Sequence, residues 1–230
     1  MTKYNHGQNV HFGTILREVV FGMEDGMVST LGAITGIAIG SQDHFIVLLA
    51  GMVIIAVESI SMGIGSYLSN QSVKEVSARK LVEEKIELAE FPKEEKEELF
   101  QMFMRDGWPE NLSRQMAEEA SRNKELILKE MAYRELKIPV ESSISPFKLG
   151  VSMFFSYIVG GAIPLIAYFV LPIALAIKVS ILITLVGLFG LGAITTRYTK
   201  SSWLRSGLRV LLLGGIALLV GFWIGKLVGS

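Results

Sequence analysis

The sequence predicts an all-α membrane protein with five transmembrane helices and a cytosolic three-helix insert between the second and third. Half of the 230 residues are hydrophobic, and the mean hydropathy is +0.46. Charge is concentrated in residues 71–146, which hold 17 of the 22 acidic and 13 of the 22 basic residues. We therefore divide the chain into a first membrane segment (1–69), a charged helical insert (70–141) and a second membrane segment (142–230).

Five apolar stretches reach the roughly 20 residues that a membrane-spanning helix needs. They cover residues 15–39, 45–67, 147–171, 172–195 and 203–228. The connections between the first and second spans and between the third and fourth are short, so these pairs are expected to be antiparallel neighbours.

Lysine and arginine are biased towards one side of the predicted membrane, which sets the orientation. Outside the insert, the bases on this side include Lys3, Arg17, Arg197, Lys200, Arg205 and Arg209. The opposite side has almost none, with Lys178 and Lys226 inside span ends. The N-terminus and the insert are therefore predicted to be cytosolic.

Glycines recur at four-residue intervals, a spacing that lets helices approach closely in lipid. The positions are Gly22, Gly26, Gly32, Gly36, Gly40, Gly221 and Gly225. Two interpretations stay open. Packing within one bundle is favoured for Gly221 and Gly225, whereas a dimer contact through the first span is the alternative for the others.

The insert is predicted to contain three helices. The first continues from the second span to about residue 89, the second begins at Pro92, and the third covers about 110–136 before Pro139. The segment carries a net charge of about −4, which suits a cation better than nucleic acid. No strand pattern, glycine-rich phosphate loop or Walker motif is present, which argues against an ATP-driven pump.

The residues that enzymes and zinc sites use most are scarce. Cysteine is absent, and the three histidines are His6, His11 and His44. None has a metal-ligand spacing within a span, and no nucleophile-base constellation is visible. The sequence therefore predicts a protein that is not an enzyme.

Acidic residues are rare in the membrane segments, where only Glu18, Glu24, Asp25, Asp43 and Glu58 occur. A carboxylate in the bilayer core costs roughly 2.5–3.5 kcal/mol on insertion scales, so such acids usually serve ions or protons. Asp25 has a shorter side chain than Glu24 and reaches less far towards the interface. Because the last three spans contain no acid, a cation path must be lined by the first two.

Glu58 and Met62 lie four residues apart and share one face of the second span. A carboxylate with a thioether suits late first-row divalent metals. The alternatives are that Met62 fills a packing gap, that Glu58 is a neutral structural acid, and that Glu24 reaches the interface.

Two glutamate pairs, Glu84/Glu87 and Glu95/Glu98, flank the turn at Pro92 in the insert. Carboxylates that converge without matched bases repel one another unless cations lie among them. The alternative is a solvated face, with Lys80, Lys85, Lys93 and Lys96 as salt-bridge partners. On these residues alone, the solvated face is favoured.

Taken together, these motifs resemble the vacuolar iron transporter family over nearly the whole chain. Three pieces carry the resemblance: Glu24-Asp25-Gly26-Met27-Val28-Ser29, Ser61-Met62-Gly63-Ile64-Gly65-Ser66-Tyr67-Leu68, and Glu84-x-x-Glu87, Pro92, Glu95-x-x-Glu98 with Met131 and Glu135. The family consists of proton-coupled exporters of ferrous iron and related divalent metals.

The resemblance implies a homodimer with an ion path at its interface, lined by Asp25 and Met62 with Glu58 as a further candidate ligand. It implies that the insert captures metal through Glu84, Glu87, Glu95, Glu98, Met131 and Glu135. The cargo would be Fe²⁺, with Mn²⁺, Zn²⁺ and Co²⁺ as further candidates, exchanged for protons and without a prosthetic group. The membrane would be vacuolar in a eukaryote and the plasma membrane in a prokaryote.

The chain departs from the family pattern at two positions. Ala132 replaces a second methionine, and Ile54 replaces a membrane glutamate for which Glu58, one turn away, is the candidate substitute. The alternative function is a membrane-anchored metal-binding or sensing module that transports nothing.

Overall fold

The computed structural model describes residues 6–138, 144–199 and 202–228, which are helical and contain no strand. Lys3, Pro139 and Lys200, used in the sequence predictions, lie outside these ranges. The chain forms two compact units, one from Met1–Leu68 with Ser145–Ser230 and one from Ser69–Ile144. We call the first the membrane unit and the second the insert.

Four helices of the described chain are long and apolar enough to cross a membrane: α2 (His44–Glu90), α6 (Pro146–Val170), α7 (Ile173–Thr199) and α8 (Trp203–Val228). The helix α1 (His6–Ser41) covers the first predicted span but is not among these four. Its two central acids, Glu24 and Asp25, lower its hydropathy. The chain is therefore a multi-pass membrane protein with four spans assigned by composition.

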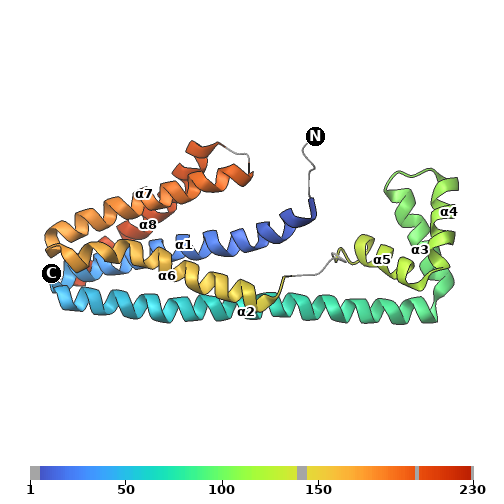
Figure 1. Ribbon diagram of the computed structural model, residues 1–230, viewed down its shortest axis with the longest axis horizontal. Helices are drawn as coiled ribbons and strands as arrows, with labels where there is room; N and C mark the ends of the chain where they lie inside the picture. The colour runs from blue at the N-terminus through green and yellow to red at the C-terminus, as the bar shows by residue number, and fades with distance from the viewer. Residues whose placement is uncertain (1–5, 139–143, 200–201, 229–230) are drawn as a thin grey trace. The chain divides into compact units, whose positions relative to one another are not determined.

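Helix α1 packs against α6, α7 and α8 within the membrane unit (Figure 1). The contact with α8 is a backbone contact: a Cβ added at Gly225 would overlap with the carbonyl oxygen of Gly36. The predicted packing of Gly221 and Gly225 within one bundle is confirmed, with α1 as their neighbour.

Helix α6 contains a proline in its interior, Pro164. Proline lacks the N–H that would bond the carbonyl of Gly160 four residues earlier. The hydroxyl of Ser180 on α7 donates a 2.7 Å hydrogen bond to the carbonyl of Pro164 itself. This neighbour therefore supports the backbone beside the interrupted turn.

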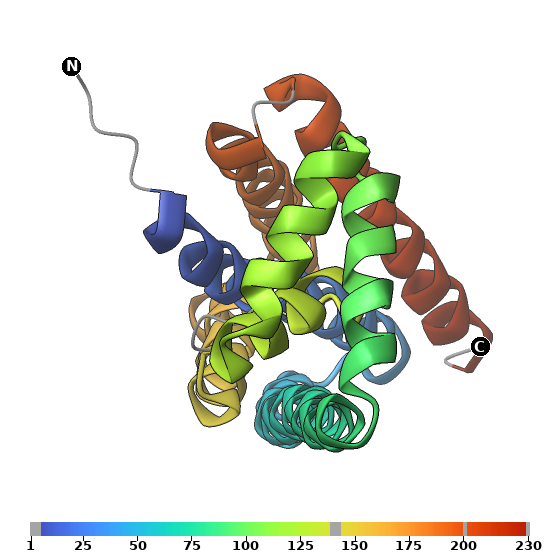
Figure 2. The ribbon, with the colours of Figure 1, turned by 90° about the vertical axis from the view of Figure 1, so that its right-hand side faces the viewer.

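The insert contains the end of α2, α3 (Pro92–Arg105), α4 (Glu110–Ser121) and α5 (Lys124–Arg134). Figure 2 shows α3 and α4 side by side. Leu99, Phe103 and Ile127 belong to the apolar core that holds these helices together.

The prediction of one helix over 110–136 is wrong, because the chain turns at Asn123. The Asn123 side chain accepts hydrogen bonds from the backbone N–H groups of Glu125 and Leu126. This is N-cap geometry, so a new helix begins at Lys124. The insert thus contributes three separate helices in addition to the end of α2.

Candidate metal sites

Asp25 lies where the backbones of α1 and α6 come into direct contact. A Cβ added at Gly26 would overlap with the carbonyl oxygen of Tyr157, and one at Gly160 would overlap with the carbonyl oxygen of Met23. Small residues at these positions are what allows so close an approach. The contact brings polar groups of α6 to the acidic turn of α1.

One α6 residue at this turn is Tyr157, whose side chain is fully buried. Its hydroxyl lies 2.5 Å from the hydroxyl of Ser29, which donates a 2.8 Å hydrogen bond to the carbonyl of Asp25. Because Ser29 has one hydroxyl hydrogen, Tyr157 is the donor in the Tyr157–Ser29 pair. Sequence reasoning missed Tyr157; the available signal was a tyrosine in mid-span, where its hydroxyl needs a partner.

The carboxylates of Asp25 and Glu58 interact electrostatically with each other and with Tyr157. The structure therefore brings together two of the predicted membrane ligands, one from α1 and one from α2. Met62 is partly buried one turn further along α2. Glu24 is partly buried beside Asp25 and interacts with its charge.

Glu58 is exposed on the surface of the single chain, although it lies within a membrane span. Its neighbours Val57 and Ile60 are also exposed. An exposed carboxylate on an apolar face of a span is costly in lipid.

Glu18 is buried and links α1 to α2. Its carboxylate accepts a 2.7 Å hydrogen bond from Ser66 and forms a 2.7 Å ion pair with Arg17. The paired carboxylate makes Glu18 a structural tie in this chain.

In the insert, Glu84 and Glu95 are buried, with 1% and 8% of their surface exposed. Glu87, Glu98 and Glu135 are exposed. One oxygen of each buried carboxylate has no hydrogen-bond partner within the described chain. Unpartnered buried oxygens of this kind are costly, and a proton or a cation relieves the cost.

Burial raises the pKa of Glu84 to about 8, and the charges of Glu135, Glu95 and Glu87 add to the shift. Burial likewise raises the pKa values of Glu95 and Glu135, with Glu98 the next cause for both. The five carboxylates therefore form one electrostatically coupled group, in which Glu84 holds a proton near neutral pH.

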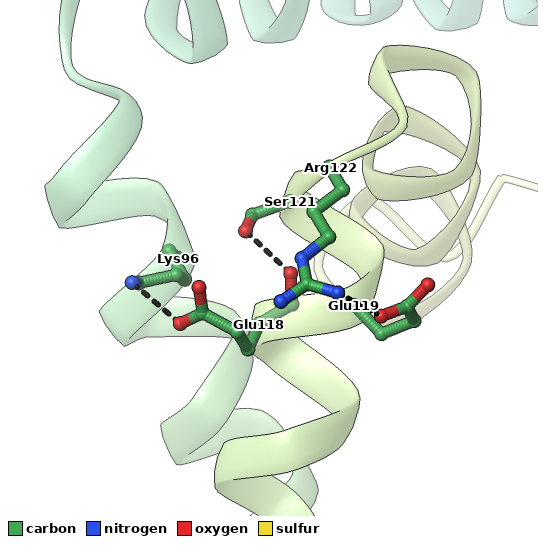
Figure 3. Close-up of polar contacts among 5 residues, drawn as sticks. All are labelled: Lys96, Glu118, Glu119, Ser121 and Arg122. Atoms are coloured by element: carbon green, nitrogen blue, oxygen red, sulfur yellow. Dashed lines mark hydrogen bonds and ion pairs between the residues drawn. The ribbon is translucent and has the colours of Figure 1, made fainter.

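None of these five glutamates takes part in an ion pair within the described part of the chain. Lys96, a proposed partner, instead forms a 3.0 Å ion pair with Glu118 on α4 (Figure 3). Figure 3 also shows Arg122 paired with Glu119 on α4. Glu87, Glu98 and Glu135 are solvated as that alternative expects, but no lysine forms an ion pair with any of the five within the described residues.

The carboxylates are coupled but not gathered into a finished coordination shell. Over the described residues, no three His, Cys, Asp or Glu side chains are placed to hold a metal ion. Met131 is fully buried and belongs to the apolar core with Leu99 and Phe103. Coordination at this group therefore requires side-chain rotation, and its ligand set stays a prediction.

The fold and these sites define a multi-pass helical membrane protein with an acidic helical insert. The VIT family model matches residues 16–226, and the chain belongs to this family. Vacuolar iron transporter 1 of Arabidopsis thaliana is 29% identical over 99% of this chain and 92% of its own. Vacuolar iron transporter 1 of Eucalyptus grandis is 28% identical over 97% and 91%.

The similarity extends beyond plants. The vacuolar iron transporter of Plasmodium falciparum is 28% identical over 96% of this chain and 85% of its own. These relatives are transporters rather than enzymes, in agreement with the sequence prediction.

Proposed function

We propose that this protein transports Fe²⁺ out of the cytosol in exchange for protons. The observation that carries the proposal is the cluster of Asp25, Glu58 and Tyr157 in the membrane unit of a chain whose relatives are named iron transporters. Carboxylate oxygens bind divalent metal and protons in competition, so one site can bind the metal in one half of the transport cycle and protons in the other. That competition is the physical basis of exchange.

The transporting form is a homodimer with five spans per subunit and with the N-terminus and insert in the cytosol. The exposed carboxylate of Glu58 supports a second copy, because a partner chain offers polar cover that lipid does not. In this arrangement Asp25 and Met62 line the path at the interface. The thioether of Met62 favours Fe²⁺, Mn²⁺, Co²⁺ and Zn²⁺ over Mg²⁺ and Ca²⁺.

The insert collects metal before transport. Its five coupled glutamates have no basic partners in the described chain, so a divalent ion relieves their repulsion. The proton that Glu84 holds near neutral pH leaves as metal enters. The membrane is vacuolar in a eukaryotic host and the plasma membrane in a prokaryotic one.

The test is metal flux in liposomes that contain the purified full-length protein. A proton gradient, acidic on the side opposite the insert, should drive Fe²⁺ uptake, and Asp25→Ala should abolish it. Asp43→Asn is a control, because Asp43 caps the start of α2 through the backbone N–H groups of Phe45 and Ile46. Unchanged uptake in the Asp25 variant would refute the proposed path.

A metal-binding or sensing module without transport is the second candidate. The observation in its favour is that the coupled glutamates all belong to the insert, which is a compact unit of its own. Metal binding to the protein without flux under any gradient would favour this function.

A further inference from the structure

A second polar site lies in the insert, near the ends of α3 and α5. It is a pocket of about 550 Å³. Its lining residues are Met102, Arg105, Asp106, Tyr133, Arg134, Lys137 and Ile138. None of the five coupled glutamates lines it, so it is distinct from the proposed metal site.

The pocket is cationic within an acidic segment. Three bases and one acid, Asp106, contribute to its lining. Asp106 is already engaged by Arg134, whereas Arg105 and Lys137 form no ion pair within the described chain. With Glu130, which also pairs with Arg134, three bases face two acids at this place, and the net positive charge favours an anion.

Arg134 is fixed in position before any ligand arrives. Its Nη1 pairs with Asp106 on the α3 side, and its Nε pairs with Glu130 at 2.9 Å. The guanidinium lies over the ring of Phe103, 4.3 Å from the centroid. Its Nη2 is outside both ion pairs, and a held guanidinium loses little entropy when it binds an anion.

The backbone at Lys137 is unusual, with a φ of 53°. Non-glycine residues seldom adopt this left-handed conformation, and functional sites are where such strain is concentrated. The conformation occurs at one of the two bases with no ion pair.

We propose that this pocket binds a phosphate monoester. The fork of an arginine matches phosphate oxygens, and a lysine adds a point charge. Met102, Tyr133 and Ile138 provide apolar surface for the organic group that carries the phosphate. A membrane lipid headgroup and a soluble phosphate ester share this chemistry, so both are sources to test.

The experiment uses full-length protein in detergent and two phosphate monoesters. Adenosine monophosphate is the soluble probe, with adenosine as its control, and calorimetry measures binding. Phosphatidic acid is the lipid probe, with phosphatidylglycerol as an anionic phosphodiester control, and native mass spectrometry counts bound lipid. Binding of either monoester above its control supports the site and identifies the source.

The variant Arg105→Gln with Lys137→Gln should weaken binding of the responding probe by about tenfold or more. The matched control, Arg122→Gln with Lys124→Gln, removes the same charge from residues that do not line the pocket. Thermal melting establishes that each variant is folded; if the pocket double variant is not, Arg105→Gln alone replaces it.

Two results would overturn the proposal: neither monoester exceeds its control, or the pocket and control variants weaken binding equally. The site does not depend on metal transport, so Asp25→Ala should leave monoester binding unchanged. A protein that does not bind either monoester can therefore still transport Fe²⁺, and the two experiments can fail separately.

Discussion

The membrane unit and the insert both bring carboxylates together, but they do so by different means. In the membrane unit, glycines let the backbones of α1 and α6 touch, which places Tyr157 beside the turn of Asp25, and Glu58 on α2 interacts electrostatically with both. In the insert, five glutamates from three helices are coupled by charge and lack basic partners within the described chain. The membrane site thus depends on backbone packing, and the insert site depends on an excess of negative charge.

The largest effect is expected from a methyl group placed in the α1–α6 contact. Gly160→Ala should destabilise the membrane unit by about 3 kcal/mol, because the new Cβ overlaps with the carbonyl oxygen of Met23. Thermal unfolding of the detergent-solubilised protein measures the change. Gly215→Ala is the control, since its Cβ has nothing within 4 Å. Equal melting temperatures for the two variants would show that the α1–α6 backbone contact does not stabilise the membrane unit.

The stability of the insert should depend on pH. The folded-state pKa of Glu84 is raised from 4.5 to about 8. Between these values the folded state holds a proton that the unfolded chain has released, so stability falls as pH rises. Replacing the acid by Glu84→Gln removes that dependence and should stabilise the metal-free protein at pH 8 by about 2–3 kcal/mol. Melting curves of full-length protein across the pH range measure this change.

Glu83→Gln is a matched control, because Glu83 is exposed and paired with Arg79 at 3.2 Å. Its variant should keep the pH dependence of the parent protein. Glu84→Gln should also weaken Fe²⁺ binding by about tenfold, since one charged oxygen donor is lost. A Glu84 variant with unchanged pH dependence would contradict the coupling described here.

A smaller effect is expected from the hydroxyl that joins α6 to the acidic turn. Tyr157→Phe removes the donor to Ser29 while keeping the buried ring, and should lower Fe²⁺ flux by about tenfold. Initial rates in liposomes measure it. Tyr133→Phe, at an exposed tyrosine of the insert, is the control. Equal rates for both variants would leave Tyr157 with a packing role only.

The smallest effect is expected at the turn between α4 and α5. Asn123→Ala removes the N-cap of α5 and should destabilise the insert by about 1 kcal/mol. Asn123→Asp keeps an accepting oxygen and should restore most of the stability. Thermal melting of the full-length protein compares the two, and an alanine variant as stable as the parent would show that the cap is dispensable.

Sequence patterns predicted the apolar helices well, because hydropathy and helix breakers act locally. The predicted fifth span ends where α8 ends, at Val228, and Pro92 starts α3 as expected. The turn at Asn123 was missed because an asparagine caps a helix only where the chain already turns. Glu24 and Asp25 lower the hydropathy of α1, so composition alone does not assign it as a membrane span.

The candidate site was less predictable, because burial and pairing depend on which helices meet. Glu84 and Glu87 look alike in the sequence, but one is buried and the other exposed. Lys96 looked like a partner for the glutamates near it, whereas it reaches Glu118 on another helix. Tyr157 is remote from Asp25 in the sequence, so no local pattern indicates that they are neighbours.

The proline within α6 makes this helix easier to bend at one turn. Because the backbone hydrogen bond between Pro164 and the carbonyl of Gly160 is missing, α6 bends most easily at that turn. The half that carries Tyr157 lies against α1, and the carbonyl of Pro164 is tied to α7 through Ser180. Because that half is packed on the α1 backbone, a small bend at this turn changes the direction of the C-terminal half of α6 and leaves Tyr157 beside the turn of Asp25.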